Sequence, residues 1–216
     1  MNLPNSITLA RIGCVPLFLW ILSSSAFLGT HGEQELLAAA VFLLASATDG
    51  MDGYVARQTN QVTTLGMLLS PLADKLLVST AYITLVKLAP ALVPSWIAVL
   101  LVGREFLVTG LHSVAAQEGM KLQVREVGKL KTVLQIVSVI SVLMAHAWPV
   151  WMANGAMVSG TAVATGAIWL MLAMSLLSAS VRFRAFLAEA LQQSRTRREP
   201  KLVVLKRAEG KDAQAR

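Results

Sequence analysis

Cysteine and charged residues are both scarce in this 216-residue chain. The single cysteine, Cys14, cannot form an intrachain disulfide, which excludes a secreted disulfide scaffold. Charged residues make up 14% of the chain, whereas an average soluble domain has about 25%. Hydrophobic residues make up 55%, and the mean hydropathy is +0.61. A soluble core of this size could not hide so much apolar surface, so the composition excludes an ordinary soluble enzyme or a disordered protein and predicts a membrane protein.

The formal net charge of +7 is concentrated near the C-terminus. From Arg182 onward the chain has ten Lys or Arg and four Asp or Glu, whereas the first 181 residues have nine and eight. We therefore predict a membrane domain over residues 1–181 and a basic cytoplasmic tail over 182–216. The tail either contacts anionic lipid headgroups or only enforces the topology, and we assign the chain no nucleic-acid partner.

The apolar runs predict an all-α, polytopic membrane protein with six transmembrane helices, because a bilayer core needs about 20 apolar residues per helix. The opening segment MNLPNSITLAR is expected to form a short interfacial helix before the first span. It lacks the basic region of a signal peptide, and equally apolar spans follow it. The predicted spans are Gly13–Gly29, Leu36–Val55, Val62–Val86, Val93–Ala115, Thr132–Val150 and Ala156–Val181.

The loop charges predict that both termini are cytoplasmic. The loops at 30–35 and 151–155 have no Lys or Arg, and the loop at 87–93 has only Lys87. The loop at 116–131 has four basic residues, and the tail has ten. Since basic loops stay on the cytoplasmic side, we expect a multi-pass protein of the cytoplasmic (inner) membrane.

The sequence shows no Gly-rich phosphate loop and no Cys/His metal cluster, and its three histidines, His31, His112 and His146, are scattered. The carboxylates within the spans are better candidates for function, because ionisable groups there are costly. Asp49 and Asp52 lie three residues apart on one helical face. The next span has a polar face of its own, with Gly66, Ser70 and Asp74 at four-residue intervals.

Carboxylates that meet in a low-dielectric site repel one another unless a cation lies between them. Oxygen ligands favour a hard ion such as Mg²⁺, Mn²⁺ or Ca²⁺, and Mg²⁺ usually completes its shell with substrate phosphates and water. This predicts a metal-assisted reaction on a phosphorylated substrate at the cytoplasmic face. The alternative is an intramembrane salt-bridge network that joins the carboxylates to Arg57, Lys75 and Arg104.

The stretch from Asp49 to Arg57, followed after eight intervening residues by Gly66 and then by Asp74, resembles the CDP-alcohol phosphatidyltransferase signature. That signature reads D-x-x-D-G-x-x-A-R, eight residues, then G-x-x-x-D-x-x-x-D. The segments LPNSITLARI, SPLADKLLV, Arg104-Glu105 and GKLKT are similar to the phosphatidylglycerophosphate synthases of this family in particular. The resemblance covers most of residues 3–180.

The resemblance implies a six-span enzyme that binds a CDP-linked lipid, CDP-diacylglycerol, through Mg²⁺ or Mn²⁺ in a two-metal site. It implies that Asp74 is both a metal ligand and the general base that deprotonates the acceptor hydroxyl of glycerol 3-phosphate, and that CMP leaves. It also implies a homodimer. The implied metal ligands are Asp49, Asp52 and Asp74, and the implied CDP-binding residues are Asp49, Asp52, Gly53, Ala56, Arg57 and Gly66.

The acceptor phosphate needs cations near the carboxylates. Arg104 is the most specific candidate, because a buried Arg needs a partner and can hold phosphate in bidentate fashion. Lys129 and Lys131, at the start of the fifth span, are the other candidates. Glu105 is expected to orient Arg104 or another cation, and we leave it out of the catalytic set.

Ser70 occupies a position where the family signature has a metal-binding aspartate. We expect weaker metal binding there, since a neutral hydroxyl replaces a carboxylate. Three interpretations stay open: an active enzyme with one metal held loosely, a catalytically impaired relative, or an engineered variant. The predicted function is phosphatidyl transfer from CDP-diacylglycerol to glycerol 3-phosphate. The alternatives are a catalytically inactive membrane protein that binds CDP-lipids and a family enzyme that uses another alcohol acceptor; a small transporter has no supporting motif.

Overall fold

The computed structural model describes residues 3–24, 32–48, 64–119, 127–153 and 156–196. These residues form helices joined by short connections, with one small hairpin between the last two helices. The elements are α1 (Leu3–Ser23), α2 (Glu33–Ala47), α4 (Thr64–Leu88), α5 (Ser95–Gln117), α6 (Val127–Ala147), β1 (Val150–Ala153), β2 (Ala156–Ser159) and α7 (Gly160–Thr196).

The predicted all-α, polytopic architecture is confirmed. In the described part of the chain, five helices (α1, α4, α5, α6 and α7) are long and apolar enough to cross a membrane. Lipid offers no hydrogen-bond partners to backbone N–H and C=O groups, and a helix satisfies these groups within its own segment. The 15 residues of α2 span only about 22 Å. The rest of the predicted second span, residues 49–55, lies outside the described residues, so the sixth span stays a prediction.

Several element boundaries differ from those predicted. Residues 156–159, expected to begin the sixth span, form β2, and α7 begins only at Gly160. The segment expected to form a separate interfacial helix is continuous with the first span in α1, and Pro16 lies inside this helix without ending it. At the other end of the chain, α7 continues past Val181 to Thr196. The helix can continue beyond Val181 because Arg, Gln and Glu have helix propensities close to that of Leu. The boundary between membrane domain and tail therefore falls within one continuous helix, and its place stays a prediction.

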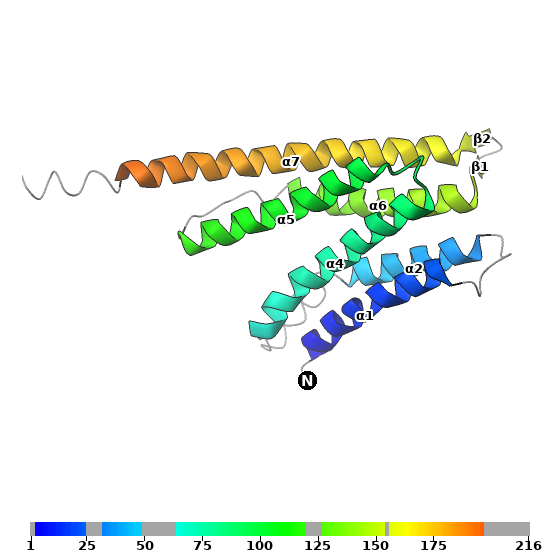
Figure 1. The fold of residues 1–216 in the computed structure, drawn as a ribbon, viewed down its shortest axis with the longest axis horizontal. Coiled ribbons are helices and arrows are strands. Elements are labelled where there is room, and N and C mark those ends of the chain that lie inside the picture. Colours follow the sequence, from blue (N-terminus) through cyan, green and yellow to red (C-terminus); the bar gives the residue numbers. More distant parts are fainter. Residues whose placement is uncertain (1–2, 25–31, 49–63, 120–126, 154–155, 197–216) are drawn as a thin grey trace, which may run out of the picture.

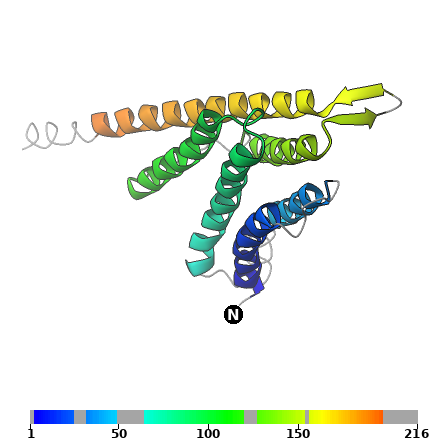
Figure 2. The same ribbon diagram turned by 45° about the vertical axis from the view of Figure 1, so that its right-hand side comes forward.

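Helix α4 lies between two groups of helices, with α1 and α2 on one side and α5, α6 and α7 on the other (Figures 1 and 2). It packs against α1, α5 and α6, while α2 also packs against α6. The buried core includes Phe18, Phe42, Leu77, Leu143 and Met171. Many large apolar side chains remain on the outside, as expected where the surrounding solvent is lipid.

A buried polar contact joins α4 to α6 within this core. The Tyr82 hydroxyl lies 2.9 Å from Ser138 Oγ, and the Ser138 hydroxyl donates to the Gln135 carbonyl at 2.9 Å. Hydrogen bonding offsets the cost of placing these hydroxyl groups among apolar side chains. The contact therefore fixes how α6 lies along α4, about two turns from Asp74 on α4 and from Lys131 on α6.

The start of α2 depends on a glycine. Gly32 has φ +87° and lies against Trp148, so that a Cβ added there would be 2.6 Å from Trp148 Cζ2. Gln34 Nε2, two residues later, donates to the Ile21 carbonyl at 2.7 Å. This junction holds the end of α1, the start of α2 and the end of α6 together.

We predict that Gly32→Ala destabilises the protein, because a left-handed conformation costs a side chain about 1–2 kcal/mol and Trp148 must also move. Thermal unfolding in detergent should show a lower midpoint. Gly110→Ala is the matched control, since a Cβ at Gly110 meets nothing within 4 Å. Equal midpoints for both variants would contradict the prediction.

Candidate active site

One face of α4 carries three of the predicted site residues. Gly66, Ser70 and Asp74 all lie within Thr64–Leu88, and their four-residue spacing places them on the same side of the helix. Gly66, Ser70 and Asp74 are each partly buried. Asp74 thus projects from a helix that lies in the middle of the bundle.

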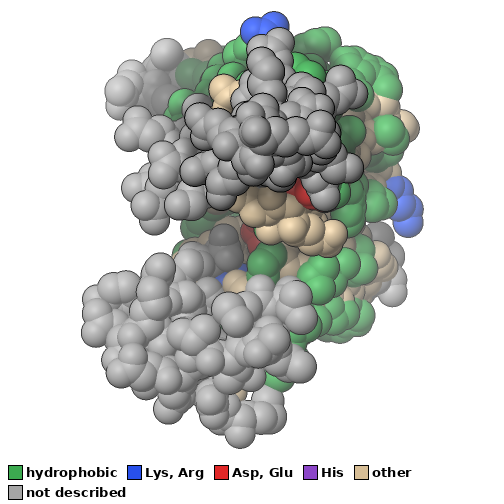
Figure 3. Space-filling view, turned by 90° about the vertical axis from the view of Figure 1, so that its left-hand side faces the viewer, with side chains coloured by type: hydrophobic (Ala, Val, Ile, Leu, Met, Phe, Trp, Pro, Cys, Tyr) green, Lys and Arg blue, Asp and Glu red, His purple; other side chains and the backbone are tan. Residues whose placement is uncertain are grey.

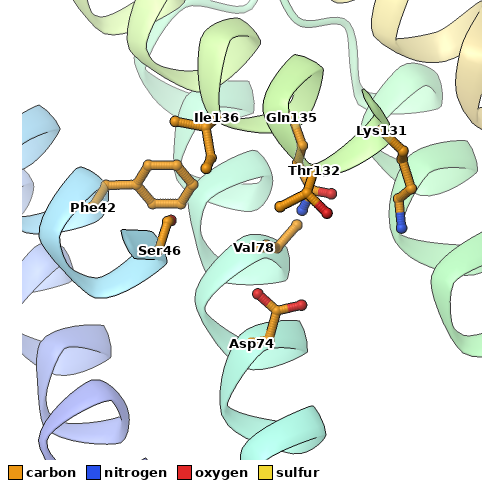
Figure 4. Close-up of a pocket in the computed structure, with 8 residues that line it drawn as sticks. All are labelled: Phe42, Ser46, Asp74, Val78, Lys131, Thr132, Gln135 and Ile136. Carbon is orange, nitrogen blue, oxygen red and sulfur yellow. The ribbon is translucent and has the colours of Figure 1, made fainter. Parts of the chain in front are cut away.

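Asp74 lines a pocket with residues from two other helices. The pocket has a volume of about 30 Å³, enough for a water-sized group or an ion. Figure 4 shows the Asp74 carboxylate directed toward the space between α2 and α6. The lining residues are Phe42 and Ser46 from α2, Asp74 and Val78 from α4, and Lys131, Thr132, Gln135 and Ile136 from α6.

The structure brings two of the predicted acceptor-side cations together around Glu105. Arg104 Nη2 donates to Glu105 Oε1 at 2.9 Å, and Lys131 Nζ forms an ion pair with the same oxygen. The three side chains are 7%, 14% and 13% exposed, respectively. One carboxylate therefore serves two cations, which leaves a net charge of +1 beside the Asp74 pocket.

Arg104 has donors that this ion pair does not use. Its Nε and Nη1 atoms are buried and have no hydrogen-bond partner among the described residues. Leaving a buried donor unsatisfied costs about 1–3 kcal/mol, and more for a charged group. These N–H groups are therefore suited to an anionic ligand.

Arg182 is a further basic residue of this region that sequence analysis missed. It lies on α7, which packs against α5 and α6, and it is close enough to Arg104 and Lys131 to repel both electrostatically. Its Nε is buried with no hydrogen-bond partner in the described part of the chain. The sequence places Arg182 at the start of the predicted basic tail, and only the packing of α7 shows that it lies near Arg104 and Lys131. Figure 3 looks at this end of the molecule, where acidic and basic side chains lie near each other.

Arg11 is a second residue that sequence analysis missed. It is fully buried on α1, and its Nε donates to the Ala45 carbonyl near the end of α2 at 3.2 Å. Thr48 Oγ1 donates to the same carbonyl at 2.7 Å. Carbonyl groups at a helix C-terminus carry partial negative charge, so Arg11 stabilises the end of α2 just before the position of Asp49 in the sequence.

The rest of the predicted site lies outside the described residues: Asp49, Asp52, Gly53, Ala56 and Arg57. Lys129 lies in the first turn of α6, but its side chain is not described. Within the described residues no group of three His, Cys, Asp or Glu side chains forms a metal site. The pocket does contain Asp74 oxygens beside Ser46 and Thr132 hydroxyls and the Gln135 amide, a donor set that suits Mg²⁺ or Mn²⁺.

A family model for CDP-alcohol phosphatidyltransferase matches residues 1–177, which include every helix of the described bundle except the end of α7. The chain belongs to the CDP-alcohol phosphatidyltransferase family. This membership confirms the resemblance seen in the sequence and identifies the chain as a member of a transferase family.

Two curated relatives of this phosphatidyltransferase have the same name, CDP-diacylglycerol–glycerol-3-phosphate 3-phosphatidyltransferase. The one from Bacillus subtilis is 44% identical over 155 residues, which cover 68% of this chain and 79% of the relative. The one from Rickettsia bellii is 40% identical over 135 residues, or 62% of this chain and 71% of the relative.

We predict that Glu105→Gln destabilises the phosphatidyltransferase, because Arg104 and Lys131 would then lose the carboxylate that they share. Removing one partner of a buried ion pair costs about 3–5 kcal/mol. The thermal unfolding midpoint in detergent should fall clearly. Glu118→Gln, at an exposed position just after α5, is the control, and a Glu105→Gln midpoint no lower than that of the control would contradict the expectation.

Proposed function

We propose that this chain transfers a phosphatidyl group from CDP-diacylglycerol to glycerol 3-phosphate, giving phosphatidylglycerophosphate and CMP in phospholipid biosynthesis. The observation that carries the proposal is the pocket that Asp74 of α4 and Lys131 of α6 line together. The names of the relatives, which match over most of their length, support these substrates. Neither the family match nor the relatives support a protein that only binds CDP-lipids, a transporter, or another acceptor.

The CDP half of the site is assigned to the end of α2 and the start of α4. Ser46 lines the Asp74 pocket, and Asp49 follows it by three positions and Asp52 by six. In this proposal Asp49, Asp52 and Asp74 hold Mg²⁺ or Mn²⁺, and Ser70 supplies a weaker, neutral ligand. The bound ion offsets the charge of the diphosphate. Gly53, Ala56, Arg57 and Gly66 contact the CDP group.

Asp74 is the general base of the proposed reaction. Its carboxylate accepts the proton of the glycerol 3-phosphate hydroxyl as the hydroxyl oxygen bonds to the lipid's phosphorus. The bond between that phosphorus and the oxygen of CMP breaks, so the leaving group takes the electron pair. The protein's contribution is mainly to position the two substrates and to stabilise their charges.

The acceptor phosphate is assigned to the basic residues on the other side of the pocket. Arg104 has two buried nitrogen atoms, and Arg182 has one, that find no hydrogen-bond partner among the described residues. Lys131 shares Glu105 with Arg104 and also lines the Asp74 pocket. Lys129 lies one half-turn before Lys131 in α6. A phosphate dianion would neutralise the excess positive charge and satisfy these donors.

The chain is further proposed to lie in the cytoplasmic membrane as a homodimer with both termini in the cytoplasm. The orientation rests on the basic loop at 116–131 and the basic tail. Asp74 and Lys131 lie in the first half of α4 and of α6, which is the half that this orientation places toward the cytoplasm. That side is where a water-soluble acceptor can reach a membrane-bound lipid.

We expect the purified chain to make phosphatidylglycerophosphate from CDP-diacylglycerol and labelled glycerol 3-phosphate in Mg²⁺ or Mn²⁺. Ser70→Asp should lower the metal concentration needed for half-maximal rate and raise turnover, because it adds a carboxylate to the site. Thin-layer separation of the labelled lipid measures both effects. Absence of product from both proteins would refute the proposed function, and a product from Ser70→Asp alone would locate the defect at Ser70.

We expect Arg182→Gln to raise the KM for glycerol 3-phosphate about 10-fold or more, because a hydrogen bond to a charged group contributes about 1.5–3 kcal/mol. The KM for CDP-diacylglycerol should change little. Arg184→Gln is the matched control, since Arg184 is exposed and lies two residues along the same helix. Equal glycerol 3-phosphate KM values for the two variants would exclude Arg182 from the acceptor site.

A further inference from the structure

The hairpin between α6 and α7 contains no charged residue. Residues 148–160 read WPVWMANGAMVSG, and β1 pairs with β2 in antiparallel register, with Met152 opposite Met157 and Trp151 opposite Val158. Hairpins that face water usually have a polar outer face. This one therefore has an unusual composition for an extramembrane connection.

One face of the hairpin exposes apolar side chains. Val150 and Met152 lie on the same side of β1, because side chains alternate along a strand, and Met157 lies across from Met152. Their exposed fractions are 58%, 80% and 80%. Burying a side chain of this size stabilises a protein by about 1.5–3 kcal/mol, so this face favours an apolar environment.

The base of the hairpin is packed firmly against the helices. Trp148 lies against Gly32, and the Trp151 ring lies so close to Gly160 that an added Cβ would be 2.8 Å from it. The Gly160 N–H also donates to the Pro149 carbonyl at 2.8 Å. These contacts hold the base of the hairpin against the starts of α2 and α7.

The hairpin directly continues two membrane-spanning helices. It follows α6, which ends at Ala147, and precedes α7, which begins at Gly160. Figure 2 shows both strands extending beyond the ends of these helices. Lys131, in the active-site pocket, is 16 residues before the end of α6, or about 24 Å along the helix axis, so the hairpin lies at the opposite end from the pocket.

We propose that this hairpin is a lipid anchor that lies at the headgroup–acyl boundary of the leaflet opposite the active site, with Val150, Met152 and Met157 among the lipid chains. Trp148 and Trp151 are residues typical of that boundary. A two-stranded hairpin leaves backbone groups unpaired along its outer edges, and these need water or headgroups. The hairpin therefore stays at the boundary and does not enter the bilayer centre.

The test uses the full chain with Cys14→Ser, reconstituted in phosphatidylcholine–phosphatidylglycerol vesicles, with one spin label at Val150, Met152 or Met157. Collision of the label with oxygen and with a water-soluble nickel complex measures its depth. Val99→Cys, on the exposed apolar face of α5, provides the lipid reference. Glu118→Cys, at an exposed position just after α5, provides the aqueous reference.

For at least two of the three labels, we expect a higher accessibility to oxygen than at the Glu118 label. We expect their accessibility to the nickel complex to be several-fold lower than at that label. Nickel accessibility equal to that at Glu118 would place the hairpin in water and overturn the proposal. Spectral broadening between labels on two copies would also overturn it, because a second copy would then cover this face. Using three positions ensures that one misfolded variant does not decide the outcome.

Discussion

The structure depends on the neutralisation of charges that lie between apolar helices. Glu105 does this for two cations at once, since Arg104 and Lys131 approach the same carboxylate oxygen. Without it, the positive charges of Arg104 on α5 and Lys131 on α6 would lose the carboxylate that they share. The pairing also leaves one positive charge in excess, and this excess is what makes the region suitable for a phosphate.

The bundle brings this positive region next to a carboxylate because of how α4 is placed. Asp74 faces α2 and α6, so one pocket has an acidic side from α4 and a basic side from α6. The Tyr82–Ser138 contact fixes α6 along α4, and Arg11 holds the end of α2 against α1. In the proposed function, the acidic side would hold the metal ion that offsets the charge of the donor's diphosphate, and the basic side would bind the phosphate of the acceptor.

Much of this arrangement could be predicted from the sequence. Long apolar runs predicted the helices, and the four-residue spacing of Gly66, Ser70 and Asp74 predicted their common face. The need of a buried Arg for a partner singled out Arg104. The pairing of Glu105 with Lys131 could not be predicted, because these residues lie on different helices and meet only through packing. The same holds for Arg11, whose partner is a backbone carbonyl, and for Arg182, which appeared to belong to the basic tail. The hairpin was missed because its residues are as apolar as the ends of the two spans and the short loop to which they were assigned.

The most direct test of the central claim compares the turnover of Asp74→Asn with that of the unchanged chain at saturating CDP-diacylglycerol and glycerol 3-phosphate. Asparagine keeps the size of the side chain but cannot take the proton from the glycerol 3-phosphate hydroxyl. The account predicts a loss of about 10²-fold or more in turnover, with the thermal unfolding midpoint nearly unchanged. Turnover equal to that of the unchanged chain would contradict the assignment of Asp74, and with it the claim that the pocket between α2, α4 and α6 is the site of phosphatidyl transfer.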